Sequence, residues 1–207
     1  MPEPRYPLLS LSRLRMGIDG PGVTTLIAGA GCPLNCRWCI NKRLLREAKP
    51  ELVTAAELLE RVRIDDLYFR ASGGGVCFGG GEALLHAPFI RRFRELCSDE
   101  WRVCAETSLA VAPELVKIAA DAVDFFIVDC KDMDEDIYRR YTGGDAALMK
   151  ENLRWLMKKA GPERVKVRVP LIPDFNTAED QARSVGILTA LGVTQCDIFS
   201  YERREDA

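Results

Sequence analysis

Three cysteines form the part of the sequence best suited to chemistry. They lie in Gly31-Cys32-Pro33-Leu34-Asn35-Cys36-Arg37-Trp38-Cys39, and the spacing C-x3-C-x2-C lets three thiolates converge on one inorganic centre. A structural zinc site needs four ligands in tetrahedral geometry, and only three are local here. A [4Fe–4S] cluster normally takes four cysteines. With three, one iron keeps an open position at which an exogenous ligand binds.

Two other interpretations of these cysteines stay open. They are either incidental thiols or three ligands of a zinc ion whose fourth ligand is Cys77, Cys104 or His86, the sole histidine of the chain. Five further cysteines are dispersed without ferredoxin-like spacing, at positions 77, 97, 104, 130 and 196. Buried cysteine commonly serves as a small hydrophobe, so we expect these five in the core and predict no second cluster.

Composition narrows the class of protein. The 207 residues are 47% hydrophobic and 29% charged, which is ordinary for a globular chain and excludes intrinsic disorder. The length predicts one domain over residues 1–207. A net charge of −2 argues against nucleic acid as the main partner. No apolar run reaches the roughly 18–20 residues of a membrane span, so no membrane partner is expected.

The cellular compartment is predicted from the N-terminus and the thiols. Residues 1–11 carry three prolines and Arg5 where a signal peptide needs an apolar core. Eight cysteines without an export signal indicate a reducing compartment and thiolate chemistry instead of disulfides. We therefore expect a cytoplasmic protein.

The elements that must position the cysteines alternate along the chain. Thr54 and Glu57 form a capping-box pattern before an amphipathic helix, and Pro170 is expected to end a strand. The expected strands are 22–28, 75–78, 102–106, 124–130, 164–169 and 196–200, and the expected helices are 55–62, 88–97, 113–120, 146–159 and 177–191. Such alternation predicts an α/β fold with a parallel sheet and right-handed crossovers. Six repeats fall short of the eight that close a barrel, so we predict a partial (β/α)6 TIM-type barrel in a single domain.

Chemistry on such a fold is expected at the carboxyl ends of the strands. Gly80, Gly81 and Glu82 follow the second strand; the glycines allow close approach of a ligand or simply a tight turn, and Glu82 joins that contact or lies exposed. Glu106 and Ser108 follow the third strand and provide acidic and hydroxyl groups, or else a capped turn.

The fourth and fifth strands end in charges. Asp129 and Lys131 lie at the mouth of an apolar strand, where they are costly unless paired with a ligand or with each other. Arg168 offers a planar fork suited to a ligand carboxylate, although it shares its strand with Lys166 and Arg164, which also fits a solvated face.

Several motifs, in this order and spacing, resemble the radical S-adenosylmethionine (SAM) superfamily. More narrowly, they resemble the glycyl-radical-enzyme activating enzymes of the pyruvate formate-lyase activase type. Beside the cysteine motif with its aromatic residue, the likeness rests on Asp19-Gly20-Pro21-Gly22, Gly79-Gly80-Gly81-Glu82-Ala83-Leu84-Leu85, Asp129-Cys130-Lys131, Tyr141-Thr142-Gly143, Glu151-Asn152-Leu153 and Arg168-Val169-Pro170-Leu171-Ile172-Pro173. It runs from about residue 15 to residue 201.

The resemblance implies a cofactor set and a reaction. It implies a [4Fe–4S] cluster in the loop 31–40, and SAM, which chelates the open iron and is reductively cleaved to a 5′-deoxyadenosyl radical that abstracts hydrogen. The implied partners are a glycyl radical enzyme and a low-potential flavodoxin or ferredoxin. The cluster ligands are then Cys32, Cys36 and Cys39, and the SAM-binding residues are Trp38, Gly80, Gly81, Glu82, Glu106, Ser108, Asp129, Lys131 and Arg168. No catalytic side chain is assigned.

The sequence departs from the activase pattern in several places. Ser200-Tyr201-Glu202 stands where activases typically carry a SAM-contacting histidine, and Ala83 stands where most relatives have proline. The 34 residues between Cys39 and Gly74 contain no cysteine, which excludes a ferredoxin-like insert, and larger activases continue beyond the position of Ala207. Two alternatives follow: a radical SAM enzyme acting on a small molecule or peptide, as compact relatives that make deazapurine precursors do, or a non-catalytic zinc-binding module.

Overall fold

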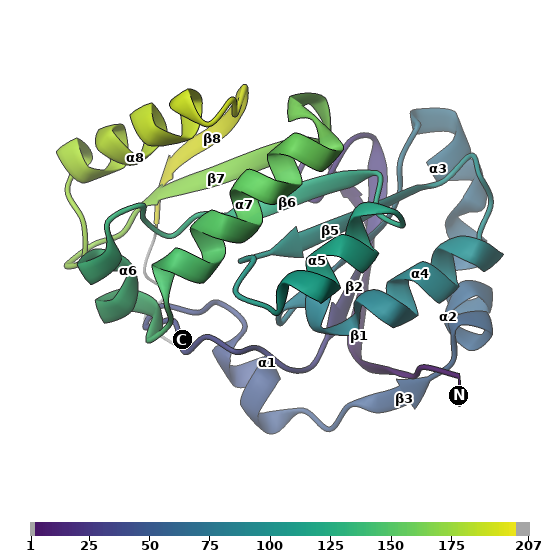
Figure 1. The fold of residues 1–207 in the computed structure, drawn as a ribbon. Coiled ribbons are helices and arrows are strands. Elements are labelled where there is room, and N and C mark those ends of the chain that lie inside the picture. Colours follow the sequence, from purple (N-terminus) through teal and green to yellow (C-terminus); the bar gives the residue numbers. More distant parts are fainter. Residues whose placement is uncertain (1–2, 202–207) are drawn as a thin grey trace.

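A computed structural model describes residues 3–201. They contain one eight-stranded sheet, with the strands in the order β3-β1-β2-β4-β5-β6-β7-β8. The six predicted strands are confirmed, and all of them run parallel. They are β2 (Val23–Gly29), β4 (Gly75–Gly80), β5 (Arg102–Thr107), β6 (Phe125–Asp129), β7 (Val165–Leu171) and β8 (Gln195–Ser200). The sheet ends in two edges and does not close, as expected of a partial barrel (Figure 1).

Two strands were not predicted, so the sheet is mostly and not wholly parallel. β1 (Tyr6–Met16) pairs antiparallel with both β2 and β3 (Glu51–Val53). The register of β1 against β2 shifts twice, between Leu8 and Ser10 and between Ser12 and Arg15. Such irregularities break the two-residue alternation that identifies a strand in a sequence.

Helices cover one face of the sheet (Figure 1). The five predicted helices are confirmed as α2 (Ala55–Val62), α4 (Ala87–Leu96), α5 (Pro113–Ala120), α7 (Ala146–Ala160) and α8 (Ala178–Ala190). Thr54 caps α2 with the expected capping box, accepting from the Glu57 amide at 3.2 Å. Elements not predicted are α1 (Lys42–Glu47), α3 (Asp66–Ser72) and α6 (Glu135–Thr142), with 3-10 turns η1 (Arg63–Asp65), η2 (Ala83–His86) and η3 (Pro162–Arg164).

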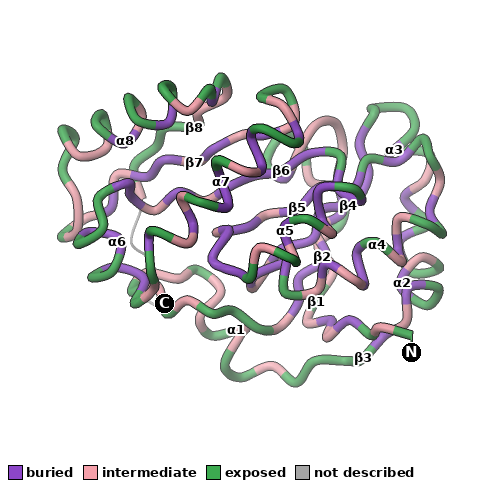
Figure 2. Tube along the Cα trace, viewed as in Figure 1, coloured by how far each residue is buried: buried purple, intermediate pink, exposed green. Residues whose placement is uncertain are grey.

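The main core lies between this helical layer and the sheet. Figure 2 shows buried residues concentrated along β4, β5, β6 and β7, whereas α1 buries none. The opposite face of the sheet carries a smaller cluster of Cys77, Cys104, Phe125 and Ile127. Gly20, in the turn between β1 and β2, covers this cluster so closely that an added Cβ would meet the Cys104 sulfur at 2.7 Å.

The remaining cysteines occupy the positions expected of small hydrophobes. Cys77, Cys97, Cys104 and Cys130 are buried, and Cys196 packs against the main core. All are free thiols. No helix among residues 3–201 is long and apolar enough to cross a bilayer.

The expected strand break at Pro170 is wrong, because β7 continues through Pro170 to Leu171. β6 ends at Asp129, opposite Arg168, so Pro170 lies beyond that ladder and its missing amide removes no bond to β6. Consequently Arg168 lies in the middle of β7, although it still stands level with the carboxyl end of β6.

Candidate functional site

The cysteine loop leaves β2 beside the end of β4. The Gly81 amide donates to the Gly29 carbonyl at 3.0 Å, and the Glu82 amide donates to the Gly31 carbonyl at 2.8 Å. A Cβ at Gly81 would lie 2.1 Å from the Gly31 oxygen, so only glycine permits this approach. The predicted close approach at the Gly-Gly-Glu turn is therefore made by the cysteine loop itself.

A second anchor is the carboxyl end of α6. The Asn35 and Arg37 amides donate to the carbonyls of Thr142 and Tyr141 at 2.8 and 3.0 Å. A Cβ at Gly144 would lie 2.4 Å from a methyl carbon of Leu34. The Tyr141-Thr142-Gly143 motif, to which the sequence analysis assigned no role, thus forms the backbone support of the loop.

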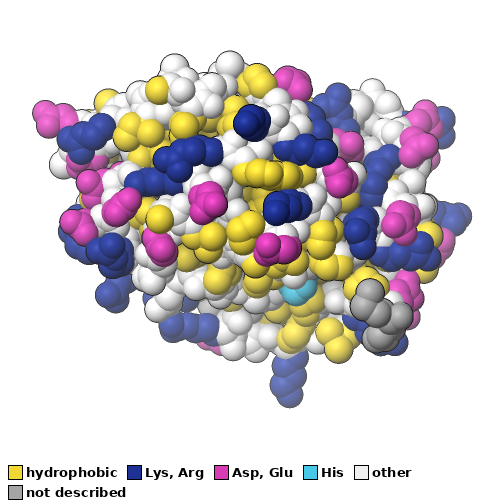
Figure 3. Space-filling model, in the orientation of Figure 1, with side chains coloured by type: hydrophobic (Ala, Val, Ile, Leu, Met, Phe, Trp, Pro, Cys, Tyr) yellow, Lys and Arg dark blue, Asp and Glu magenta, His cyan; other side chains and the backbone are white. Residues whose placement is uncertain are grey.

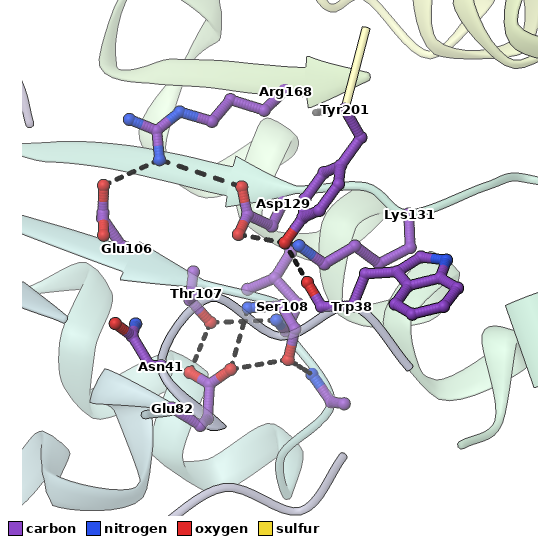
Figure 4. A network of polar contacts seen from close by, with 12 residues as sticks. Trp38, Asn41, Glu82, Glu106, Thr107, Ser108, Asp129, Lys131, Arg168 and Tyr201 are labelled. Carbon is purple, nitrogen blue, oxygen red and sulfur yellow. Dashed lines mark hydrogen bonds and ion pairs between the residues drawn. The ribbon is translucent and has the colours of Figure 1, made fainter. Parts of the chain in front are cut away.

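Two side chains that sequence reasoning did not assign to the site hold the rest of the loop. The Asn41 amide group donates to the Gly80 carbonyl at 2.8 Å. Tyr201, which follows β8, donates its hydroxyl to the Trp38 carbonyl (Figure 4). Tyr201 thus lies at the site in the stretch where the resemblance expects a histidine, while the neighbouring Glu202 lies outside the described residues. Both side chains bond backbone carbonyls, which no sequence pattern reveals.

The three loop cysteines remain free thiols, with Cys32 exposed and Cys36 and Cys39 half-buried. Burial raises the pKa of Cys36 to about 11; Lys131 opposes this rise, and Cys32 and Cys39 add to it. The charges of Cys32 and Cys39 are thus close enough to act on the Cys36 thiol. Since thiolates are the ligand form, a bound cation would have to supply the compensating charge.

These donors suit a cluster better than a single ion. Among residues 3–201, no three Cys, His, Asp or Glu side chains are grouped as ligands of one metal ion. A preassembled zinc site with Cys77, Cys104 or His86 as fourth ligand is therefore not formed; His86 instead contacts the Ala30 carbonyl at 2.9 Å. Three thiols on a cubane bind three different irons and need not meet at one atom, so the loop fits a [4Fe–4S] cluster with one open iron.

Glu82 links the ends of β4 and β5 (Figure 4). It is buried, so the alternative of an exposed carboxylate is wrong. One oxygen accepts from the Thr107 hydroxyl at 2.6 Å and the Leu84 amide at 3.0 Å, and the other accepts from the Ser108 amide and hydroxyl at 2.8 and 2.6 Å. Burial raises the pKa of Glu82, and these hydrogen bonds offset part of the rise.

A row of charges crosses the neighbouring strands at the same edge. Arg168 lies 2.7 Å from Glu106 and 3.9 Å from Asp129, and Asp129 in turn pairs with Lys131 at 3.0 Å. Asp129 and Lys131 thus form the mutual ion pair that the sequence analysis gave as the alternative to ligand binding. The pair is not on an open surface, because only 17% of the Lys131 side chain is exposed. Burial, the largest single influence, lowers the pKa of Lys131, but Asp129, Cys36 and Tyr141 together raise it above its ordinary value, so the ammonium stays charged.

Comparison with known proteins identifies the family. The sequence model of the radical SAM superfamily matches residues 26–183. The chain belongs to the radical SAM superfamily. This membership implies a [4Fe–4S] cluster and SAM, confirms that the protein is an enzyme, and leaves the non-catalytic zinc module without support.

Two curated relatives of this chain are activating enzymes. Choline trimethylamine-lyase activating enzyme of Oleidesulfovibrio alaskensis is 28% identical over 81% of this chain and 73% of its own length. Pyruvate formate-lyase 1-activating enzyme of Escherichia coli K12 is 27% identical over 83% and 70%. These matches confirm the resemblance to glycyl-radical-enzyme activating enzymes.

A solved radical SAM structure shares the fold. Streptococcus suis SuiB bound to its precursor peptide SuiA matches with a TM-score of 0.66 at 14% identity, over 86% of this chain and 38% of SuiB. The chain thus spans less than half of SuiB, and the likeness concerns the fold alone.

Proposed function

We propose that this protein installs a glycyl radical on a partner enzyme by reductive cleavage of SAM. The observation that carries the proposal is the similarity to activating enzymes over more than four-fifths of the chain. The cysteine loop, placed where β2 ends and beside the ends of β4, β5 and β6, supports it, because all predicted site residues then face one edge of the sheet.

Cys32, Cys36 and Cys39 would hold the cluster and leave one iron for the amino and carboxylate groups of SAM. When bound and reduced, the cluster supplies the electron that cleaves a C–S bond of SAM, giving methionine and a 5′-deoxyadenosyl radical that takes a hydrogen atom from glycine. The protein supplies orientation and exclusion of side reactions.

The charged row supplies groups for both ends of SAM. Lys131 stays protonated beside Asp129 and is the candidate donor to the SAM carboxylate. Glu106 and Asp129 provide negative charge that suits the sulfonium cation. Arg168, already paired with Glu106, is the second candidate for a carboxylate and fixes the position of that acid.

The remaining predicted residues belong to the cysteine loop and to the ends of β4 and β5. Gly80, with φ of +89°, and Gly81 hold the cysteine loop against β4, and through that loop they would act on the amino end of SAM. Trp38 would pack against the adenine and shield the cluster. Glu82 acts through the strand ends that it fixes, since each of its oxygens already accepts two hydrogen bonds, and Ser108 lies at the end of that network.

Anaerobic reconstitution tests the proposal. The protein should turn brown, with about four irons and four sulfides per chain and broad absorbance near 400 nm. Addition of reductant, SAM and a candidate glycyl radical enzyme should give 5′-deoxyadenosine and a glycyl radical signal in electron paramagnetic resonance. Turnover of a small molecule or peptide without any protein partner would instead support the alternative substrate class.

A further inference from the structure

Positive charge is concentrated in the segment that follows the cluster motif. Residues 37–49 contain the bases Arg37, Lys42, Arg43, Arg46 and Lys49 and one acid, Glu47, which gives a net charge of +4. The whole chain carries −2, so the rest of the molecule carries −6. The net charge of residues 37–49 is therefore opposite in sign to that of the rest of the chain. We call residues 37–49 the basic segment.

The basic segment exposes an apolar centre within its charged rim. α1 buries no residue, and Ile40, just before it, is 62% exposed. A shallow groove of about 480 Å³ is lined by Ile40, Arg43, Leu44, Glu47 and Ala48. Figure 3 shows Lys and Arg side chains projecting at the lower edge of the molecule, where α1 lies in Figure 1, with exposed hydrophobic side chains beside them. An apolar centre with a polar rim is the usual layout of a protein interface.

The base of α1 is fixed to the candidate site. The Lys42 amide donates to the Cys39 carbonyl at 3.2 Å, and the Asn41 side chain holds the Gly80 carbonyl at 2.8 Å. α1 therefore begins three residues after the last cluster cysteine and turns its unpacked face outward. A protein that covers this face lies directly beside the three thiols.

The proposed reaction needs such a neighbour. Each SAM cleaved consumes one electron from outside the protein, and electron transfer demands close approach of the donor to the cluster. Electron-transfer partners use small, transient interfaces. Their association is accelerated when oppositely charged surfaces steer the encounter.

We propose that the basic segment docks a small acidic one-electron carrier protein, whose carboxylates surround its redox centre and meet the bases of the segment. One of these bases, Arg43, already pairs with Glu47 at 3.0 Å. The inference rests on the proposed function, because it names the electron source of the same site. In the step itself, the reduced carrier loses one electron and the oxidised cluster gains it, and no bond is made or broken.

The experiment measures cluster reduction without SAM, by stopped-flow bleaching near 400 nm. Reduced flavodoxin is the acidic carrier, and the methyl viologen radical cation is the small control reductant. The flavodoxin rate constant should fall as salt rises, whereas the viologen rate constant should not fall. The double variant Arg46→Glu/Lys49→Glu should slow flavodoxin at least about tenfold and leave viologen unslowed. Ile40→Ser should slow flavodoxin without changing the salt dependence.

The matched control is Arg91→Glu/Arg154→Glu, which reverses two exposed charges on α4 and α7 and should leave both rates unchanged. Co-sedimentation of oxidised flavodoxin, followed by its flavin absorbance, should weaken in the Arg46→Glu/Lys49→Glu variant and not in the matched control. An unchanged flavodoxin rate in that variant overturns the proposal. A second result also overturns it: the same variant is reduced by flavodoxin at the normal rate but activates a glycyl radical enzyme poorly when viologen supplies the electron. That result would assign the surface to the glycyl radical enzyme.

Failure of the proposed function gives a different result. A protein whose cluster is reduced through the basic segment but does not cleave SAM would contradict the proposed function and leave the docking surface supported. SAM cleavage driven by viologen in the double variant, without reduction by flavodoxin, supports both.

Discussion

The chain carries cysteines in two settings that share a residue type and differ in surroundings. Cys32, Cys36 and Cys39 lie on one loop at the carboxyl edge of the sheet, exposed or half-buried. Cys77 and Cys104 are register partners on β4 and β5, buried in the smaller cluster on the face of the sheet opposite the main core. Both settings raise thiol pKa values by burial, to about 11 for Cys36 and about 12 for Cys104.

Burial thus raises the thiol pKa in both settings, so the direction of the shift does not distinguish the candidate ligand Cys36 from the core residue Cys104. What differs is the support around them. The sulfur of Cys104 meets the turn at Gly20, which leaves no space for a ligand. The loop cysteines are held through backbone hydrogen bonds to β4 and α6, so their side chains stay unpacked. The backbone hydrogen bonds of residues 31–40 therefore distinguish the candidate metal-binding loop from the core cysteines better than thiol pKa values do.

The largest expected effect separates the two settings directly. Cys36→Ala should abolish the brown colour and the bound iron, because two thiolates cannot hold the cluster. Cys104→Ala should keep about four irons per chain and lower the free energy of unfolding by about 1 kcal/mol through lost packing. Iron and sulfide analysis after anaerobic reconstitution, with urea unfolding of the apoprotein, measures both. Loss of iron in Cys104→Ala would show that the core thiols take part in cluster binding.

A smaller effect compares two lysines on neighbouring elements. Lys131 lies at the site edge beside Asp129, whereas Lys166 lines a pocket at the amino ends of the strands. Lys131→Ala should keep the colour and weaken SAM binding about tenfold, which is about 1.4 kcal/mol. Lys166→Ala should change neither. Because Asp129 and its other neighbours hold the pKa of Lys131 above its ordinary value in spite of burial, the difference should persist unchanged across neutral pH.

Calorimetric titration of the reconstituted protein with SAM measures this pair of variants. Equal affinities for Lys131→Ala and the unaltered protein would show that the ion pair with Asp129 is only structural. Equal losses in both lysine variants would point to a general charge effect instead of a contact at the site.

The regular part of the fold could be predicted from the sequence because its signals are periodic. The buried strand over 124–130 and the capped helix over 55–62 are confirmed within one residue at each end. β1 escaped prediction because its register shifts twice against β2. α1 escaped because it is short and buries no residue, so it has no apolar stripe to detect.

The candidate site also has a part that could be predicted from the sequence and a part that could not. Side-chain chemistry at strand ends could be predicted, and the structure brings Glu106, Asp129, Lys131 and Arg168 into one row. The anchors of the cysteine loop could not be predicted, because the Tyr141 and Thr142 carbonyls act through the backbone, which every residue type shares. Ligand assignments for SAM remain predictions of the resemblance.

The smallest expected effect tests whether loop support is distributed over many backbone bonds. Tyr201→Phe removes only the hydroxyl that donates to the Trp38 carbonyl. Iron content should stay unchanged, while amide hydrogen exchange in residues 36–40 should rise about fivefold, the equivalent of about 1 kcal/mol. Tyr68→Phe, at a half-exposed tyrosine on α3, should leave that exchange unaltered. If Tyr201→Phe instead lost the cluster, one side chain would hold the loop, and anchoring by β4 and α6 would be insufficient.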